Sequence, residues 1–444
     1  MSNNSNEKEM AVRVECYPEE ALIDQVISIQ VLNLLPFTSV TISAWIEQNG
    51  KHFGSYSHYT VSEHGDVDLS KECAEPSGLY VGVESMGLFW SMVSVPGQRT
   101  GERLYQSEAS EPLAFEIRVY DGHLCWDELW VKYEERGVIK AGCSEENLLA
   151  KKVVLRSYKA PDVSRIVVET GRIRGTLFIP AGLRDGETRP GVIDMFGSRG
   201  GLLEMRAALL ASHGFVAMAL GYFYYKDLPT ELRFEYEYFE EAAHWLQSQP
   251  NVAPGGIGMV GVSLGAQITL YMGLNCPIVK SAVGIGHPPT FGTGTKFTRA
   301  GQLVPCLNLQ CISIVIQNDG MRSMQVEYDL EKYFTFNTSH TPSLLIILGA
   351  EDTMVKGSDV TKWLDTLSDA DRSMVEVAVY EGAGHLIEPP HAPLCSATYH
   401  KWLKGVAYYG GTPKLHAVAQ EESWKRIRDF LWNTLGKGYT KSRL

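Results

Sequence analysis

The chain has 444 residues, an apolar content of 44% and a formal net charge of −12 at pH 7. Its length suggests two domains, because a single hydrophobic core rarely grows beyond about 250–300 residues. The acidic balance argues against a nucleic-acid partner or an anionic membrane surface, and an anionic ligand would need a local basic patch.

The N-terminal residues, the apolar runs and the cysteines indicate where in the cell the protein is expected to work. Residues 1–9 carry acids and no apolar core, so they resemble neither a signal peptide nor a transit peptide. No apolar run approaches the roughly 20 residues of a membrane-spanning helix. The eight cysteines are scattered and form no C-x-x-C pair, which favours reduced thiols inside the cell and argues against a structural zinc site.

Residues 11–150 are predicted to form an all-β domain. Three stretches alternate apolar and polar side chains, as strands with one buried face do. The apolar positions are Ile27, Ile29, Val31, Val40, Ile42, Ala44, Phe115, Ile117 and Val119. Turn-forming groups such as Gln48-Asn49-Gly50 separate these stretches. Several short strands at this spacing predict a β-sandwich, and we find no catalytic constellation in it.

Residues 165–444 are predicted to form an α/β-hydrolase domain, after a linker at 150–165. Strands are expected at 166–168, 175–179, 191–196, 216–220, 257–260, 279–285, 344–348 and 375–380. Helices are expected near 202–213, 230–248, 266–272 and 421–435. The first two strands are expected to form a hairpin. Apolar strands that alternate with helices indicate a mostly parallel sheet covered by helices on both faces.

The most informative motif is Gly261-Val262-Ser263-Leu264-Gly265. It lies between the predicted strand at 257–260 and the predicted helix at 266–272, which is the setting of a nucleophile elbow. The sharp turn leaves no room for large side chains two positions to either side of the serine. We therefore predict that Ser263 is a catalytic nucleophile rather than an ordinary turn serine.

The acid and the histidine of such a site follow the serine along the chain, in that order. Asp352 comes just after a buried apolar strand, and we prefer it to its neighbour Glu351. His385 follows the next strand on a glycine-rich loop, whereas the competing His287 precedes the acid. The imidazole would take the proton of the serine hydroxyl, and the carboxylate would fix the tautomer of the imidazole.

The oxyanion of the tetrahedral intermediate needs backbone N–H donors that are already aimed at it. Leu264, the residue after the nucleophile, is the expected first donor. The second is expected from the glycine-rich loop at 197–201, where Ser198 and Arg199 are the candidates. The side chain of Arg199 is itself expected to be a solvated charge.

Further motifs extend over almost the whole chain. They are Glu84-Ser85-Met86-Gly87-Leu88-Phe89-Trp90, Arg174-Gly175-Thr176-Leu177-Phe178-Ile179-Pro180, Asp194-Met195-Phe196-Gly197, Tyr238-Phe239-Glu240-Glu241-Ala242 and Gly384-His385-Leu386-Ile387-Glu388-Pro389-Pro390. With them the chain resembles the acyl-CoA thioesterase / bile acid-CoA:amino acid N-acyltransferase family. The resemblance implies a β-sandwich followed by an α/β-hydrolase domain, with the catalytic nucleophile, acid and histidine at Ser263, Asp352 and His385.

The identity of the nucleophile divides this family, because the thioesterases use serine and the bile acid amidating enzyme uses cysteine. Ser263 thus implies hydrolysis of acyl-CoA to a fatty acid and CoA, with no metal or redox cofactor. The following residues, Leu264-Gly265-Ala266-Gln267-Ile268, are closer to the amidating branch than to the Lys-Gly-Gly of many thioesterases. Arg199 also replaces a small residue common in the family. Acyl transfer to glycine or taurine is therefore the alternative function, and a non-enzymatic binding protein is a third hypothesis.

The last three residues, Ser442, Arg443 and Leu444, keep the small, basic, leucine order of the peroxisomal Ser-Lys-Leu signal. We therefore expect the peroxisomal import receptor to be a partner, besides the acyl-CoA substrate. The expected location is the peroxisome, and the alternative is the cytoplasm.

Overall fold

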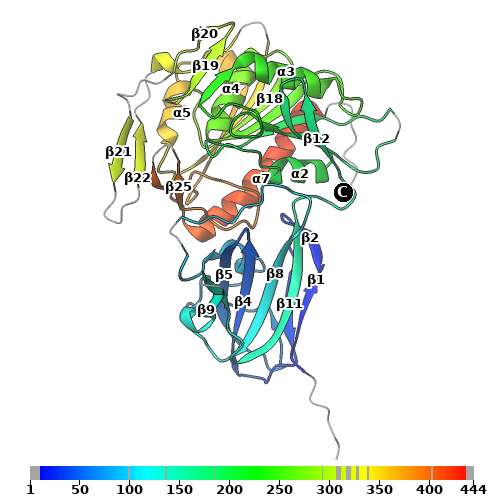
Figure 1. Ribbon diagram of the computed structural model, residues 1–444, viewed down its shortest axis with the longest axis vertical. Helices are drawn as coiled ribbons and strands as arrows, with labels where there is room; N and C mark the ends of the chain where they lie inside the picture. Colours follow the sequence, from blue (N-terminus) through cyan, green and yellow to red (C-terminus); the bar gives the residue numbers. More distant parts are fainter. Residues whose placement is uncertain are drawn as a thin grey trace, which may run out of the picture. The chain divides into compact units, whose positions relative to one another are not determined.

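The computed structural model describes residues 11–98, 101–135, 138–184, 186–292, 294–306, 312–316, 322–326, 330–337, 340–401 and 404–436. The chain forms two compact units (Figure 1): Met1–Leu104 with Pro112–Ser157, and Tyr105–Glu111 with Tyr158–Leu444. No feature of the sequence predicts that Tyr105–Glu111 belongs to the second unit.

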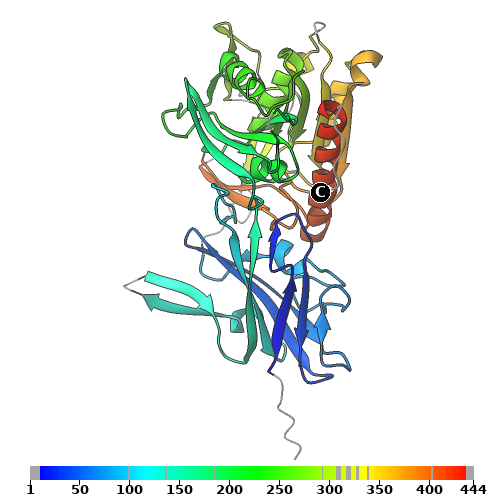
Figure 2. The same cartoon turned by 90° about the vertical axis from the view of Figure 1, so that its right-hand side faces the viewer.

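The first unit is built from β-sheets. One sheet has the order β1-β3-β6, and a larger one has the order β2-β11-β8-β4-β5-β7. The strands are β1 (Arg13–Tyr17), β2 (Glu20–Leu22), β3 (Ser28–Leu32), β4 (Ser39–Gln48), β5 (Lys51–Thr60), β6 (Val67–Asp68), β7 (Val93–Ser94), β8 (Leu113–Asp121) and β11 (Leu148–Ser157). The helix α1 (Gly87–Trp90) and the 3-10 turn η1 (Trp126–Glu128) are short. The hairpin of β9 (Trp130–Glu135) and β10 (Val138–Cys143) projects from this unit (Figure 2).

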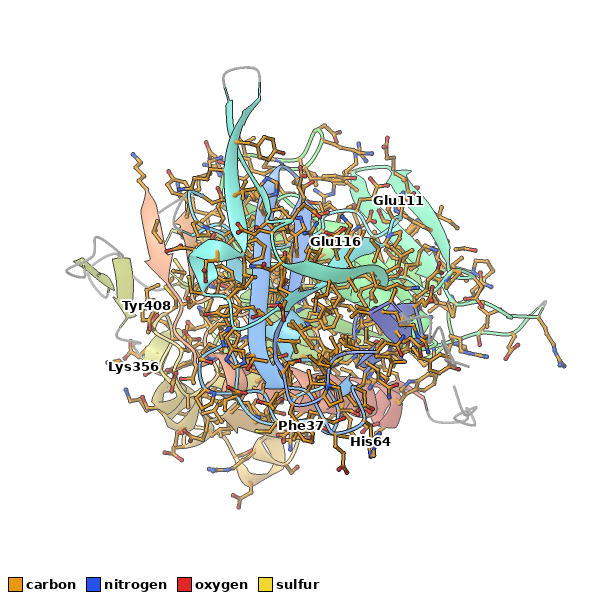
Figure 3. The ribbon with its side chains drawn as sticks, turned by 90° about the horizontal axis from the view of Figure 1, so that it is seen from below. Phe37, His64, Glu111, Glu116, Lys356 and Tyr408 are labelled. Carbon is orange, nitrogen blue, oxygen red and sulfur yellow. The ribbon has the colours of Figure 1, made fainter. Side chains whose placement is uncertain are left out.

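The predicted alternation of side chains is confirmed in this unit. The apolar residues named for the three stretches are buried, and Ile29 and Val31 alternate with less buried neighbours along β3. Such alternation places one face of each strand in the core. Phe37 lies in the turn between β3 and β4 and is 74% exposed (Figure 3).

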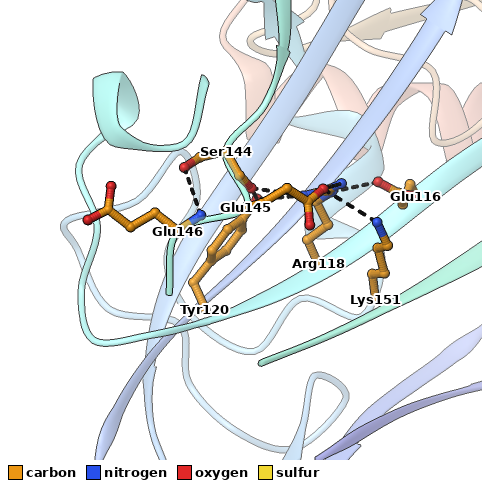
Figure 4. A network of polar contacts seen from close by, with 7 residues as sticks. All are labelled: Glu116, Arg118, Tyr120, Ser144, Glu145, Glu146 and Lys151. Carbon is orange, nitrogen blue, oxygen red and sulfur yellow. Dashed lines mark hydrogen bonds and ion pairs between the residues drawn. The ribbon is translucent and has the colours of Figure 1, made fainter. Parts of the chain in front are cut away.

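A buried arginine organises one part of the larger sheet (Figure 4). Arg118 on β8 is 5% exposed and contacts the carboxylates of Glu116 at 2.5 Å and Glu145 at 2.7 Å. It also donates a hydrogen bond to the carbonyl of Ser144, which the Tyr120 hydroxyl contacts as well. These partners compensate the cost of removing the guanidinium from water.

The second unit is an eight-stranded sheet with helices on both faces, so the predicted α/β-hydrolase fold is confirmed. The sheet order is β12-β13-β15-β14-β17-β18-β23-β24. Strand β13 pairs antiparallel with both of its neighbours, and the strands from β15 to β24 pair in parallel. The strands are β12 (Ser164–Thr170), β13 (Ile173–Ile179), β14 (Gly191–Met195), β15 (Val216–Gly221), β17 (Ile257–Val262), β18 (Val279–Ile285), β23 (Ser343–Gly349) and β24 (Val375–Tyr380).

Long helices cover both faces of this sheet. In Figure 1, α2 (Met205–Ser212) and α7 (Pro413–Leu435) lie on one side of it, and α3 (Tyr236–Gln247) and α4 (Leu264–Asn275) lie on the other. Apolar side chains of α3, α4 and the strands beneath them form a large core cluster, in which Phe239, Ile268 and Met259 are fully buried.

Two helix starts lie far from the predicted positions. Helix α3 begins at Tyr236 rather than near 230, because Arg233–Glu235 form the strand β16, which pairs with β19 (Lys296–Arg299). Helix α7 begins at Pro413 rather than near 421. The proline explains this earlier start, because its fixed φ suits the first position of a helix.

The remaining elements are small. They are β20 (Gln302–Leu303), β21 (Ile312–Ile316), β22 (Arg322–Val326), the 3-10 turn η3 (Leu330–Lys332), α5 (Gly357–Leu364), α6 (Asp369–Arg372), β25 (Ala397–His400) and β26 (Gly405–Tyr408). Strands β25 and β26 form a hairpin that follows the loop of His385. None of the described helices is long and apolar enough to cross a membrane. The seven cysteines in the described ranges are free thiols, and two of them, Cys73 and Cys125, are exposed.

Candidate active site

Ser263 lies at a sharp turn between β17 and α4. Its backbone has φ of 55° and ψ of −118°, a region that residues with a side chain rarely occupy. The turn ends the strand and begins the helix within one residue. Strain of this kind persists only where the surroundings enforce it, and it is the geometry of a nucleophile elbow.

The two glycines of the motif are required by close backbone contacts. A methyl group at Gly261 would overlap the carbonyl group of Gly265 and lie 2.5 Å from the hydroxyl of Thr269. A methyl group at Gly265 would lie 2.6 Å from the carbonyl oxygen of Phe196. The G-x-S-x-G spacing is therefore a steric requirement of the strand, the turn and the neighbouring loop.

We expect Gly261→Ala to destabilise the protein by at least about 3 kcal/mol, the upper end of the usual cost of overpacking. The new methyl group meets backbone, which cannot rotate away as a side chain can. Chemical denaturation measures the effect. Gly357→Ala is the matched control, because its nearest contact would be an ordinary 3.9 Å from the Leu348 side chain. Equal stability of the two variants would contradict the steric argument.

The structure brings Ser263, His385 and Asp352 together. Nε2 of His385 lies 2.9 Å from the hydroxyl of Ser263, and Nδ1 lies 2.8 Å from Oδ2 of Asp352. The side chains of His385 and Asp352 are 3% and 1% exposed. Both distances are those of hydrogen bonds, so a proton can pass from the hydroxyl to the imidazole while the carboxylate holds the ring.

Asp352 is held by its own loop after β23. Its Oδ1 accepts hydrogen bonds from the backbone N–H of Met354 at 2.7 Å and of Val355 at 3.0 Å. Its Oδ2 is thereby directed at the imidazole. Glu351, the alternative carboxylate, accepts a hydrogen bond from Thr412 and is exposed. The structure therefore places Asp352, and not Glu351, next to His385.

The candidate oxyanion donors border the same turn. Leu264 is the first residue of α4, where a backbone N–H has no acceptor within the helix. Gly197 packs against the nucleophile, since a methyl group there would lie 3.5 Å from the Ser263 hydroxyl. In the described part of the chain, neither the N–H of Leu264 nor that of Ser198 has a hydrogen-bond acceptor. Both groups are thus available to a ligand.

The peptide between Gly197 and Ser198 has a defined orientation. The carbonyl of Gly197 accepts a hydrogen bond from the N–H of Gly200 at 3.3 Å, and the Tyr222 hydroxyl, which bonds the carbonyl of Phe196, lies 3.5 Å from it. In a trans peptide the N–H points opposite to the C=O, so the N–H of Ser198 points away from Tyr222. Ser198 directly follows Gly197, which packs against Ser263, so its N–H is taken as the second donor in the mechanism proposed for this chain.

Three residues around the triad were missed in the sequence. The backbone N–H of His385 donates to the carbonyl of Tyr409 at 2.9 Å, and the two rings stack at 5.5 Å. His416 on α7 accepts from the N–H of Gly384 and contacts the carbonyl of Leu386, both at 3.1 Å. Nε2 of His400 lies 3.0 Å from the hydroxyl of Ser198. The first two hold the loop of His385, and the third holds the loop at 197–201, which carries the candidate oxyanion donors.

The bonds of His416 require its neutral form, because Nδ1 accepts while Nε2–H donates. Burial lowers the pKa of His416 from 6.5 to about 4. The unfolded chain therefore binds this proton at higher pH than the folded protein. We expect the free energy of unfolding to be highest above about pH 6.5 and to fall as the pH drops from there toward 4.

A glutamine at 416 could keep both hydrogen bonds without titrating, so His416→Gln is expected to reduce this pH dependence. Other buried histidines contribute to it too, since burial lowers the pKa of His287 to about 3. Denaturant unfolding at a series of pH values measures the slope. An identical slope in His416→Gln would contradict the assignment.

His287, the competing histidine, is committed to other partners. Its Nδ1 contacts the carbonyl of Pro288 at 2.7 Å, and its Nε2 contacts the amide of Gln267 at 3.0 Å. The side chain of Arg199, expected to be a solvated charge, is exposed but lies over the ring of Tyr105, with 4.2 Å from Cζ to the ring centre.

The arrangement can perform acyl transfer. It combines a hydroxyl with a hydrogen-bonded base, a carboxylate that orients the base, and two N–H groups beside the nucleophile. Among the described residues, no three His, Cys, Asp or Glu side chains are placed to hold a metal ion.

The chain matches two protein-family models and is similar in sequence to several known proteins. The family model described as "Acyl-CoA thioester hydrolase/BAAT N-terminal region" matches residues 24–170, and "BAAT / Acyl-CoA thioester hydrolase C terminal" matches residues 234–437. Acyl-coenzyme A amino acid N-acyltransferase 1 of Mus musculus is 35% identical over 95% of this chain and 97% of its own. Bile acid-CoA:amino acid N-acyltransferase of Homo sapiens is 35% identical with the same coverage. Acyl-coenzyme A thioesterase 1 of Rattus norvegicus is 33% identical over 93% of this chain and 94% of its own.

Proposed function

Because the chain belongs to the acyl-CoA thioester hydrolase/BAAT family, we propose that it is a serine-dependent acyl-CoA thioesterase. The observation that carries the proposal is the 2.9 Å contact between the Ser263 hydroxyl and Nε2 of His385. A serine so placed can accept the acyl group of a thioester and pass it to water.

The reaction begins when the Ser263 oxygen attacks the thioester carbonyl and His385 takes its proton. The N–H groups of Leu264 and Ser198 hold the oxyanion, and Asp352 stabilises the imidazolium. The intermediate then collapses, the carbon–sulfur bond breaks, and His385 returns the proton to the departing CoA thiolate. His385 next activates a water molecule, which hydrolyses the acyl-enzyme to a free fatty acid.

The second candidate function is transfer of the acyl group to glycine or taurine. It shares the first half of the reaction and differs only in the acceptor. N-acyltransferases are among the relatives, and the Leu264-Gly265-Ala266-Gln267-Ile268 run resembles that branch. The serine nucleophile favours hydrolysis as the first candidate.

A panel of acyl-CoAs separates the candidates. Free CoA is measured with a thiol reagent, and the acyl products are identified by mass spectrometry with and without glycine or taurine. The thioesterase releases free fatty acid whether or not an amino acid is present. A product that is mainly an amide when taurine or glycine is added would establish the second function instead, and no CoA release from any substrate would contradict both.

We also propose a role in fatty acid metabolism within peroxisomes. The support is the C-terminal triplet Ser442-Arg443-Leu444, which lies outside the described residues. Deletion of these three residues is expected to move a fluorescently tagged chain, with the tag at its N-terminus, from peroxisomes to the cytoplasm. An unchanged location would argue against a receptor-read address.

A further inference from the structure

Two cationic side chains flank the oxyanion loop. The guanidinium of Arg199 lies over the ring of Tyr105, with Cζ 4.2 Å from the ring centre. The ammonium of Lys401 lies over the ring of Tyr224, with Nζ 3.6 Å from the ring centre. Both cations are exposed. Each is thus positioned by an aromatic face while its charge stays accessible to solvent.

A hydrogen bond between the residues that precede them joins the two segments that carry Arg199 and Lys401. The Ser198 hydroxyl lies 3.0 Å from Nε2 of His400, and Arg199 and Lys401 are the next residues along the two segments. The contacts around Gly201 also show that Arg199 and Tyr224 lie close together. A methyl group there would lie 3.6 Å from Nη1 of Arg199 and 3.8 Å from the carbonyl oxygen of Tyr224, whose ring carries Lys401.

The same loop connects the cations to the candidate nucleophile. Gly197, two residues before Arg199, is the residue whose added methyl group would lie 3.5 Å from the Ser263 hydroxyl. Arg199 therefore lies two residues along the loop from the contact with the candidate nucleophile. A cation in this position can contact a portion of the substrate that is connected to the reacting carbonyl but remote from it.

Neither cation is neutralised by a carboxylate within the described residues. Apart from its ring contact, Arg199 donates a long hydrogen bond of 3.4 Å to the carbonyl of Gly200, which leaves its charge uncompensated. Several other cations of this unit are paired with carboxylates: Arg206, for example, lies 2.5 Å from Asp194. Two accessible cations close together are notable in a chain whose formal net charge is −12. They form the local basic patch that an anionic ligand would need.

We propose that Arg199 and Lys401 bind the phosphate groups in the nucleotide portion of a CoA thioester. This inference rests on the proposed function. The nucleotide belongs to CoA, which is the leaving group of the proposed thioesterase reaction. The pantetheine arm separates the thioester from these phosphates, so their binding site belongs outside the reacting centre. Arginine offers a planar fork of donors and lysine a point charge, and both are common phosphate ligands.

The test compares two substrates with the same acyl chain. Acyl-CoA carries the phosphates, whereas the acyl-pantetheine thioester lacks the nucleotide and its phosphates. We expect Arg199→Gln and Lys401→Gln each to raise KM for acyl-CoA by about 5- to 10-fold, the size of a lost charge-assisted contact at an exposed site. Their kcat and their KM for acyl-pantetheine should stay within about twofold of the wild type.

Lys280→Gln is the matched control, because it removes one exposed positive charge of the same unit at the amino end of β18, whereas Ser263 follows the carboxyl end of the parallel strand β17. It is expected to leave both KM values unchanged, which separates local binding from the effect of net charge. Arg199→Lys should restore part of the affinity for acyl-CoA. Increasing salt should raise KM for acyl-CoA more in the wild type than in the double variant Arg199→Gln/Lys401→Gln.

The outcomes distinguish the failure of this inference from that of the proposed function. If the wild type hydrolyses neither substrate, the proposed function is wrong. If it hydrolyses both and the two variants keep the KM of the wild type for acyl-CoA, the phosphate site is wrong. Equal rises of KM for both substrates would also overturn it, because they indicate a disturbed loop. Lys401→Gln decides independently if Arg199→Gln does not fold.

Discussion

Replacing Ser263 with alanine is expected to lower the rate of CoA release by on the order of 10⁶-fold, the usual cost of removing the nucleophile of a triad. The variant keeps the backbone atoms and the Cβ that the turn accommodates, so its fold is expected to persist. Only the oxygen 2.9 Å from Nε2 of His385 is lost. Thiol release from acyl-CoA measures the rate, and a serine-directed fluorophosphonate should label the wild type but not the variant.

Ser248→Ala is the matched control for this experiment. The Ser248 hydroxyl bonds the carbonyl of Trp245 at the end of α3, on the exposed surface, and has no place in the proposed reaction. The control is expected to retain full activity. Turnover by Ser263→Ala within ten-fold of the wild type would exclude the acyl-enzyme mechanism.

The second large effect is expected for Asp352→Asn, at about 10⁴-fold in kcat. The Asn side chain would keep its oxygen toward the N–H groups of Met354 and Val355, which bond Oδ1 of Asp352 at 2.7 and 3.0 Å. Its amide nitrogen would then face Nδ1 of His385 as a donor. The imidazole would have to carry its proton on Nε2, where it could no longer accept the proton of Ser263.

Glu351→Gln provides the comparison, because Glu351 is the neighbouring carboxylate and contacts Thr412 rather than the imidazole. This variant is expected to stay within a few-fold of the wild type. Similar losses for the two variants, or an Asp352→Asn enzyme within ten-fold of normal, would show that the carboxylate does not set the tautomer of His385. Steady-state kinetics with one acyl-CoA distinguishes these outcomes.

Sequence alone identified Ser263, Asp352 and His385 as candidates, and the structure brings them together, because the constraints on them are local. The glycines at 261 and 265 are required by backbone contacts within and beside the turn, so they are visible as a motif. Strand β23 is an apolar run because both faces of the sheet are covered there, and this run marked the position of Asp352. The edge strand β24 is less buried, but its valines still marked the strand before His385. The order of serine, acid and histidine then followed from the fold.

The supporting residues could not be found in this way, because their constraints are tertiary. His416 holds the loop of His385 although it lies on α7, 32 residues after Gly384. Its neighbours along the chain do not mark it as different from any other helical histidine. The contact of Arg199 with Tyr105 joins segments that are still farther apart. The predicted start of α3 was wrong because of another tertiary contact. Arg233–Glu235 form a strand only by pairing with β19.

The anchoring of the His385 loop makes the segment that follows this loop necessary to the proposed reaction, although that segment supplies no residue of the triad. Tyr409 and His416 hold this loop, and Gly410 packs so closely on the backbone of Glu351 that a side chain there would overlap it. A shortened isoform or a proteolytic fragment that ends soon after His385 would thus retain all three triad residues in its primary structure. Detection of those residues in a transcript or a peptide map would accordingly be no guarantee of a working enzyme.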